Sequence, residues 1–283
     1  MPLSESASLI LSSLLEARTG QQLASSRRWR IETALAPLMR EHAFATLDQL
    51  IGAIASGRDP ALADAAIEAL LNNETSFFRD RGAFSSLFGP VLDRLERTHA
   101  KRKRLRLWCA GCSTGQEPYS LAMHFAEAPA RWRGWAIEIL ASDVSRTAVA
   151  QAREGLYSQF EAQRGLSMGQ LLRWFTQDGT HSWRIAPELR RAVRFDVANL
   201  VGPPRPVGRF DIILCRNLLL YFGPHTRWLA LDRLAAASAP GAVLMLGAGE
   251  TVIGQGDAFA SDPAIPGLYA LRDASEPRLL AAS

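Results

Sequence analysis

Residues 105–117 read LRLWCAGCSTGQE, and they decide the fold of the larger part of the chain. The apolar run at 105–110 has the length of a buried strand, and it leads directly into a turn that contains Gly111 and Gly115. A helical pattern follows at 117–128. Two glycines permit a tight turn and let a ligand approach the backbone closely, so we expect a binding site where this strand ends.

The pattern continues toward the C-terminus, where short apolar runs alternate with helical stretches. Such alternation predicts βαβ units and a parallel sheet, with ligands bound beyond the carboxyl ends of the strands. A segment at about 160–192 breaks the rhythm, and we expect it to form a small inserted β-subdomain. The predicted strands are 105–110, 137–142, 193–197, 210–215 and 242–246, and the predicted helices are 117–128, 146–154 and 225–239.

Toward the N-terminus the apolar residues recur at helical spacing instead. Breaks at Gly20, Gly57 and Pro60 divide this stretch into about four short helices. No strand pattern interrupts them, so this part is expected to be all helical. The expected boundaries are a helical domain at 1–78 and a sheet domain at 79–283 that opens with a helix at 80–98.

The bulk composition limits the classes of protein that the chain can represent. With 283 residues and 48% hydrophobic content it can bury a full-sized core, and no apolar run approaches the roughly 20 residues of a membrane span. No basic and apolar leader opens the chain, so we expect a cytoplasmic protein. Basic clusters at 27–30 and 101–106 have no nucleic-acid-binding motif beside them, and we expect neither a nucleic acid partner nor membrane insertion.

The three cysteines are too few and too unevenly placed for a disulfide framework. Cys109 and Cys112 have the C-x-x-C spacing of metal and redox sites, but no second pair of cysteine or histidine ligands matches them. We interpret these cysteines as structural residues and expect no metal ion.

Three ligands are compatible with the glycine-rich turn. A dinucleotide is disfavoured, because the G-x-G-x-x-G pattern is missing and Glu117 puts negative charge where phosphates would lie. A serine hydrolase is the second reading, with Ser113 as nucleophile in a G-x-S-x-G match and His181 or His225 as base, although no strands precede it. S-adenosylmethionine (SAM) is the third, since it carries a sulfonium and a ribose but no phosphate.

Polar residues follow the next three strands of the predicted sheet. Asp143 ends the second strand, where an acid holds ribose hydroxyls in nucleoside-binding sheets, although it could equally cap the helix that follows. Asn199 follows the third strand and Asn217 the fourth, and an asparagine amide can both donate to and accept from an adenine edge. Together with the turn these residues predict a nucleoside site.

A further block, NETSFFR at 73–79, lies at the junction of the two parts of the chain. It is either a linker with two buried phenylalanines or a cover over the ligand cleft. In the second reading Arg79 offers a charged fork to a carboxylate.

Taken together, these blocks resemble the chemotaxis receptor methyltransferases, the CheR family. The resemblance covers nearly the whole chain and rests on N-x-T-x-F-F-R at 73–79, GCSTGQEPYS at 111–120, the acid at Asp143, Asn199-Leu200 and CRNLLLYF at 215–222. It implies a Rossmann-like class I SAM-dependent methyltransferase sheet, SAM as cofactor with S-adenosylhomocysteine (SAH) as product, and methyl esterification of receptor glutamates in sensory adaptation.

The resemblance also implies roles for individual residues. Arg79 and Tyr221 would face the reacting carboxylate as catalytic residues. The basic residues at 27–30 would meet the receptor's cytoplasmic methylation helices, and we expect the enzyme to be a monomer. The cofactor would be bound by Asn73, Thr75, Arg79, Gly111, Glu117, Asp143, Asn199, Leu200, Asn217 and Leu218.

Two departures from the family pattern affect these expectations. Members often carry G-H-S-E after the fifth strand, whereas this chain has GAGE at 247–250, which puts contacts of the histidine and serine in doubt. Members that dock on a receptor's C-terminal pentapeptide carry a longer glycine-containing loop than 176–183, so the chain resembles the pentapeptide-independent branch. Two rivals stay open: a methyltransferase acting on a small molecule, and a regulatory domain that binds SAM or SAH without catalysis.

Overall fold

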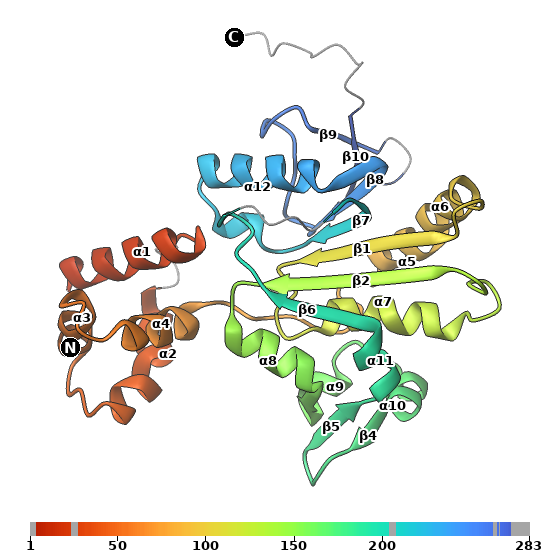
Figure 1. Ribbon diagram of the computed structural model, residues 1–283. Helices are drawn as coiled ribbons and strands as arrows, with labels where there is room; N and C mark the ends of the chain where they lie inside the picture. Colours follow the sequence, from red (N-terminus) through yellow and green to blue (C-terminus); the bar gives the residue numbers. More distant parts are fainter. Residues whose placement is uncertain (1–3, 24–27, 204–207, 263–264, 266, 273–283) are drawn as a thin grey trace. The chain divides into compact units, whose positions relative to one another are not determined.

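The computed structural model describes residues 4–23, 28–203, 208–262, 265 and 267–272 (Figure 1). The chain forms two compact units. The first comprises Met1–Asn72 together with Tyr221–Thr226, and the second comprises Asn73–Leu220 together with Arg227–Ser283. Residues 73–78, expected in the helical domain, therefore pack with the second unit.

The first unit is built from four helices, α1 (Glu5–Thr19), α2 (Arg28–Glu41), α3 (Leu47–Ala55) and α4 (Pro60–Leu70). Local signals set their ends: Thr46 and Gln49 form a capping box at the start of α3, and Asp59 caps α4. Apolar faces of the four helices meet in one core that contains Leu11, Leu35, Leu50 and Ala66.

A short segment from late in the sequence completes this unit. The main-chain N–H of Gln22 donates to the carbonyl of Tyr221 (2.7 Å), and Gln21 forms a β-bridge with Phe222. The Asn72 side chain donates to the Tyr221 hydroxyl oxygen (2.6 Å). Residues 221–226 are thus anchored to the helical unit, although the residues on both sides of them belong to the other unit.

The second unit contains a seven-stranded sheet in the order β6-β2-β1-β7-β8-β10-β9. The first five strands of this order run parallel, and β10 is antiparallel to both β8 and β9. The order reverses between β1 and β7, which is where ligands bind in open α/β sheets. The strands are β1 (Arg104–Ala110), β2 (Ala136–Asp143), β6 (Val193–Val197), β7 (Phe210–Cys215), β8 (Ser238–Leu246), β9 (Phe259–Ser261) and β10 (Leu268–Leu271).

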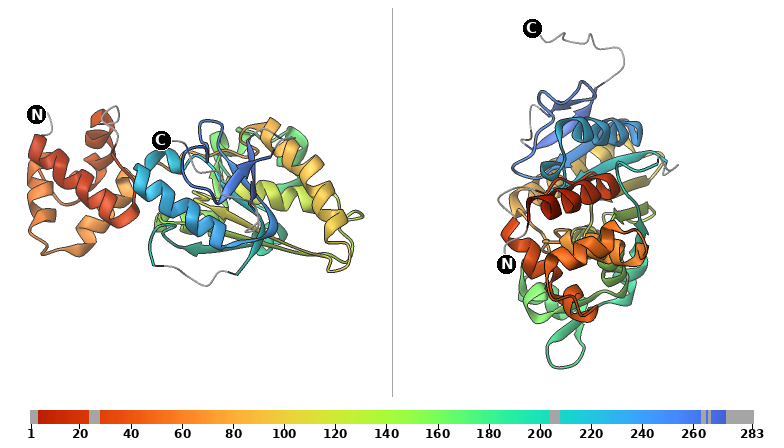
Figure 2. Two further views of the ribbon diagram at one scale, coloured as in Figure 1. Left: turned by 90° about the horizontal axis from the view of Figure 1, so that it is seen from above. Right: turned by 90° about the vertical axis from the view of Figure 1, so that its left-hand side faces the viewer.

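Helices cover both faces of this sheet (Figures 1 and 2). On one face lie α7 (Gln116–Glu127) and α8 (Arg146–Glu154), which share a core with α5 (Arg81–Ser86) and α6 (Leu92–Thr98). The other face carries α12 (Pro224–Ala236). A parallel sheet between helices confirms the expected α/β class.

A three-stranded antiparallel sheet in the order β3-β5-β4 forms a small subdomain between α8 and α11 (Pro187–Ala192). Its outer strands β3 (Leu156–Ser158) and β4 (Phe175–Gln177) flank β5 (Ser182–Ile185). Two short helices, α9 (Gln159–Gln163) and α10 (Met168–Trp174), connect β3 to β4.

Three local features differ from the sequence prediction. The helix expected at 80–98 is interrupted by a π-helical turn, η2 (Leu87–Val91), because Pro90 has no N–H to continue the α-helical pattern. Helix α12 ends at Ala236, since β8 begins at Ser238. Strands β9 and β10 were not predicted.

Within the described ranges, no helix combines the length and apolarity that crossing a membrane requires.

Candidate functional site

The glycine-rich turn after β1 is as tight as the sequence suggests. Gly111 and Gly115 have φ values of 83° and 94°, a region that costs glycine little. A Cβ atom on Gly111 would lie 2.9 Å from Cδ2 of Leu218. The turn therefore packs directly against the loop after β7 and admits no side chain at this position.

Asp143 links this turn to the end of β2. One carboxylate oxygen accepts the N–H of Ser113 (2.8 Å), and the other accepts the N–H of Ser145 (2.9 Å). The cap of α8 is Ser145, whose hydroxyl accepts from Ala148, so Asp143 is not the helix cap. Each carboxylate oxygen can accept more than one hydrogen bond, so these two main-chain bonds do not prevent Asp143 from accepting a ligand hydroxyl.

The hydrolase reading of Ser113 is contradicted by its hydrogen bond. The Ser113 hydroxyl donates to the main-chain carbonyl of Asn73 (2.7 Å), so its proton is not directed at a histidine base. This bond instead fastens the 73–79 segment to the glycine-rich turn.

Glu117 lies at the start of α7 in a buried ion network. Arg216, whose side chain is only 2% exposed, donates to Glu117 (2.8 Å) and to Asp80 (2.5 Å). Burial raises the pKa of the Glu117 carboxyl, while the charge of Arg216 opposes that rise. Arg79 acts on this carboxyl in the same sense as Arg216. The network presents a fixed acidic group beside the turn.

The 73–79 segment is held in an uncommon conformation. Phe78 has φ of 47° and Asp80 of 58°, both in the left-handed region. The Phe78 N–H donates to the Ser120 hydroxyl (2.9 Å), and the Arg79 guanidinium donates to the carbonyl of Glu74 (2.9 Å). Asn73, Thr75 and Arg79 thus lie on one strained segment, next to the Ser113 turn.

The inserted subdomain supports both this segment and the turn. Phe77 is fully buried and makes edge-to-face contacts with Tyr157 and Phe175. The Tyr157 hydroxyl donates to the carbonyl of Thr114 in the glycine-rich turn (2.8 Å). Gly165 lies so close to Phe77 that a Cβ atom there would fall 1.8 Å from the Phe77 carbonyl oxygen.

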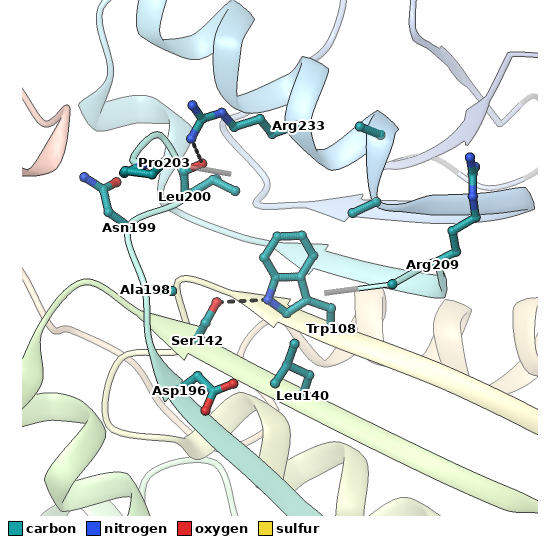
Figure 3. A pocket seen from close by; sticks show the side chains of 13 residues that line it. Trp108, Leu140, Ser142, Asp196, Ala198, Asn199, Leu200, Pro203, Arg209 and Arg233 are labelled. Carbon is teal, nitrogen blue, oxygen red and sulfur yellow. Dashed lines mark hydrogen bonds between the residues drawn. The ribbon is translucent and has the colours of Figure 1, made fainter. Parts of the chain in front are cut away.

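Asn199 and Leu200 follow β6. The Asn199 side-chain oxygen accepts the N–H of Val201 (3.0 Å), and the Leu200 carbonyl accepts from Arg233 of α12 (3.0 Å). Both residues line a cavity of about 340 Å³ on the α12 face of the sheet (Figure 3). The Trp108 indole lines the same cavity and donates to the Ser142 hydroxyl (2.9 Å), whereas neither Asp143 nor Glu117 lines it.

Asn217 and Leu218 follow β7, next to the turn. Asn217 has φ of 57°, and the Leu218 side chain faces Gly111. Glu250, which sequence reasoning did not select, accepts the N–H of Asn217 (2.7 Å). Arg216 was also missed, although it stands inside the CRNL block that pointed to this loop.

Tyr221 and the basic cluster at 27–30 belong to the first unit, whereas the residues described above belong to the second. In the basic cluster at 27–30, Arg27 and the side chains of 28–30 lie outside the described residues. Cys109, Cys112 and Cys215 are buried free thiols whose pKa values burial raises. Among the described residues, no group of three or more His, Cys, Asp or Glu side chains is arranged to hold a metal ion.

The second unit thus places the Glu117 and Asp143 carboxylates and Asn217 beside the glycine-rich turn, at the carboxyl ends of the parallel strands. Residues 73–264 match the family described as CheR methyltransferase, SAM binding domain. The chain belongs to this family. The Glu117 carboxylate suits a ligand with a cationic end, and the Asp143 carboxylate can accept from the hydroxyls of a ribose. The chain is a SAM-dependent methyltransferase.

Relatives match the chain over most of its length. The chemotaxis protein methyltransferase of Vibrio parahaemolyticus is 33% identical over 259 residues, which cover 91% of this chain and 93% of the relative. Chemotaxis protein methyltransferase 1 of Vibrio cholerae is 33% identical over 90% of this chain and 92% of its own. Chemotaxis protein methyltransferase 1 of Pseudomonas aeruginosa is 33% identical over 90% and 93%.

Proposed function

We propose that this CheR-family enzyme methylates glutamate side chains on the cytoplasmic helices of methyl-accepting chemotaxis receptors. The observation that carries the proposal is the match to chemotaxis protein methyltransferases over 90–91% of the chain, which extends beyond the SAM-binding domain into the helical unit. A small-molecule methyltransferase would not need to share that helical unit. We further propose that the enzyme acts in the cytoplasm as a monomer.

We assign the cofactor site to the residues around the glycine-rich turn. Asp143 would accept the ribose hydroxyls, and Glu117 would face the cationic amino end of the ligand. Asn199 and Asn217 would read the adenine edge, with Leu200 and Leu218 packing beside it. Asn73, Thr75, Arg79 and Gly111 complete the proposed set. Two hydrogen bonds support this assignment. The Asp143 carboxylate accepts the N–H of Ser113 in the turn, and the Ser113 hydroxyl donates to the carbonyl of Asn73 in the 73–79 segment.

SAM, when bound, supplies a methyl group on a positively charged sulfur, and its transfer to a glutamate carboxylate gives a methyl ester and SAH. The chain need not provide a general base, because a glutamate with a pKa near 4.3 is already ionised at neutral pH. Its own residues would align the carboxylate and exclude water from it.

Arg79 is proposed to orient the reacting carboxylate rather than to bind it tightly. A strong ion pair would stabilise the ground state more than a transition state in which charge is being cancelled. The Arg79 guanidinium also donates to the Glu74 carbonyl, which would limit its movement. Tyr221 is proposed as a second residue that faces this carboxylate, on the strength of the CRNLLLYF resemblance.

The inserted subdomain supports assignment to the pentapeptide-independent type. Strand β4 ends at Gln177 and β5 begins at Ser182, and the N–H of Asp178 donates to the Ser182 carbonyl across the turn (2.8 Å). Arg184 also pairs with Asp178 (2.6 Å). The connection between β4 and β5 is therefore a short, closed turn rather than a long loop.

If the enzyme does not use the receptor's C-terminal pentapeptide, a receptor from which the last five residues are deleted should be methylated as fast as the intact receptor. A severalfold slower rate would contradict this assignment.

The decisive experiment mixes the purified enzyme with receptor-containing membranes and SAM labelled on its methyl group. Label that appears on a receptor and is released by mild base identifies a glutamate methyl ester. The Asp143→Ala variant is the control, because its weaker binding of SAM should greatly reduce the label. SAM binding without any receptor label would favour a regulatory or small-molecule role instead.

A further inference from the structure

One carboxylate holds the loop after β7 in place. A Glu250 oxygen accepts the N–H groups of Asn217 (2.7 Å) and Gly247 (2.8 Å), and its other oxygen accepts the N–H of Leu220 (3.2 Å). Glu250 stands after β8, in a turn closed by its own N–H donating to the Gly247 carbonyl (3.0 Å). Three main-chain donors from two strand ends thus converge on one side chain.

Gly247 makes this convergence possible. A Cβ atom at Gly247 would lie 2.8 Å from the Glu250 carboxylate oxygen and 2.9 Å from the Asn217 nitrogen. The two residues between them are different, because Ala248 and Gly249 are exposed and a Cβ atom on Gly249 would meet nothing within 4 Å. Of the four turn residues, the first and the last make the contacts.

The loop that Glu250 holds is the one against which the glycine-rich turn packs. Asn217 has φ of 57°, in the left-handed region, which costs most residues free energy although it costs asparagine less. The Leu218 side chain then reaches Gly111, as its position 2.9 Å from a hypothetical Gly111 Cβ shows. If Asn217 relaxed to a common conformation, Leu218 would leave this position.

We propose that Glu250 is a positioning residue for cofactor binding, which acts with Gly247 by clamping Asn217 and Leu218 in their binding conformation. The inference rests on the proposed cofactor site. On this proposal, exchange of the family's middle two residues for Ala248-Gly249 leaves the clamp intact. Those positions lie on the exposed side of the turn, whereas the clamp uses only the glycine and the glutamate that remain.

The test compares Glu250→Gln and Gly247→Ala with the matched control Gly249→Ala. In Glu250→Gln one acceptor oxygen becomes an NH2 group, which cannot accept a hydrogen bond from the main-chain N–H that it faces. In Gly247→Ala the new methyl group pushes the Glu250 carboxylate away. Each should raise the Kd for SAH by calorimetry, and the KM for SAM, about tenfold, while kcat at saturating SAM changes little. Gly249→Ala should bind SAH as the wild type does.

Two results would overturn the proposal. One is wild-type SAH affinity in folded Glu250→Gln. The other is an equal loss of affinity in Gly249→Ala. If neither clamp variant folds, amide hydrogen exchange of the wild-type protein decides the matter: the N–H groups of Asn217, Gly247 and Leu220 should exchange far more slowly than that of Ala248, and equal rates would refute the clamp. SAH binding needs no receptor, so failure of receptor methylation would leave this test intact.

Discussion

Asp143 is the residue on which cofactor affinity should depend most. Its oxygens accept from Ser113 and Ser145, so it both shapes the turn and offers acceptors to a ribose. We expect Asp143→Ala to raise the Kd for SAM and SAH by roughly 100-fold, as loss of two hydrogen bonds to a charged group would. Calorimetry measures this, with Asp93→Ala on α6 as a surface control. Affinity within a factor of two of wild type would remove Asp143 from the site.

The Glu117 carboxyl should make cofactor binding depend on pH. Burial raises its pKa, so on acidification Glu117 takes up a proton at a higher pH than an ordinary glutamate. The neutral acid cannot attract a cationic ligand, and affinity for SAH should therefore fall as the pH drops through this raised pKa. Calorimetric titrations at several pH values should show this fall in SAH affinity for the wild type. Glu117→Gln should bind SAH more weakly, and its affinity should change less with pH. Parallel profiles would contradict the assignment.

At this scale the sequence predicts residues that stand next to a signal and misses those that depend on distant partners. Glu117 and Asp143 could be selected because each directly follows a turn or a strand end. Arg216 contacts Glu117 across 99 positions, and Glu250 contacts Asn217 across 33 positions. Nothing local in either segment predicts such a pairing, because it arises only when the parallel strands bring their carboxyl ends together.

Among the elements, β3 of the inserted subdomain should contribute to cofactor binding although it lies outside the large sheet. Its Tyr157 contacts Phe77 of the 73–79 segment and donates to the Thr114 carbonyl. We expect Tyr157→Phe, which keeps the ring and removes one buried hydrogen bond, to weaken SAH binding about fivefold. Phe160→Ala in the same subdomain is the control, since Phe160 is 73% exposed. Calorimetry that finds both variants equal to wild type would show that the subdomain does not support the site.

The sequence predicts an element well where a clear apolar run or helical pattern marks it, and it misses elements that are short or that interrupt such a pattern. The strand expected at 105–110 is β1 (Arg104–Ala110), and that expected at 210–215 is β7. Strands β9 and β10 are short and follow an irregular stretch, so their apolar residues form no clear period. The π-helical turn at Leu87–Val91 was missed because Gly89 and Pro90 lie within an otherwise helical pattern.

For the whole molecule, the buried thiols report on unfolding. Cys109, Cys112 and Cys215 are buried, and their raised pKa values keep them protonated at neutral pH. We expect a thiol reagent to label the native protein only as fast as it opens, and saturating SAH to slow this labelling because it stabilises the folded state. Mass spectrometry at several times gives the rates. Rapid labelling of all three cysteines without denaturant would contradict the burial.

The return of residues 221–226 to the helical unit has a consequence for biosynthesis. The ribosome translates α1 to α4 before the second unit, yet the Gln21–Phe222 bridge and the Asn72–Tyr221 hydrogen bond need residues that emerge only after β7. Helices α1 to α4 are thus translated about 150 residues before the segment that completes their unit. Nascent chains arrested before Tyr221 would carry the four helices without the contacts that residues 221 and 222 make to Asn72 and Gln21.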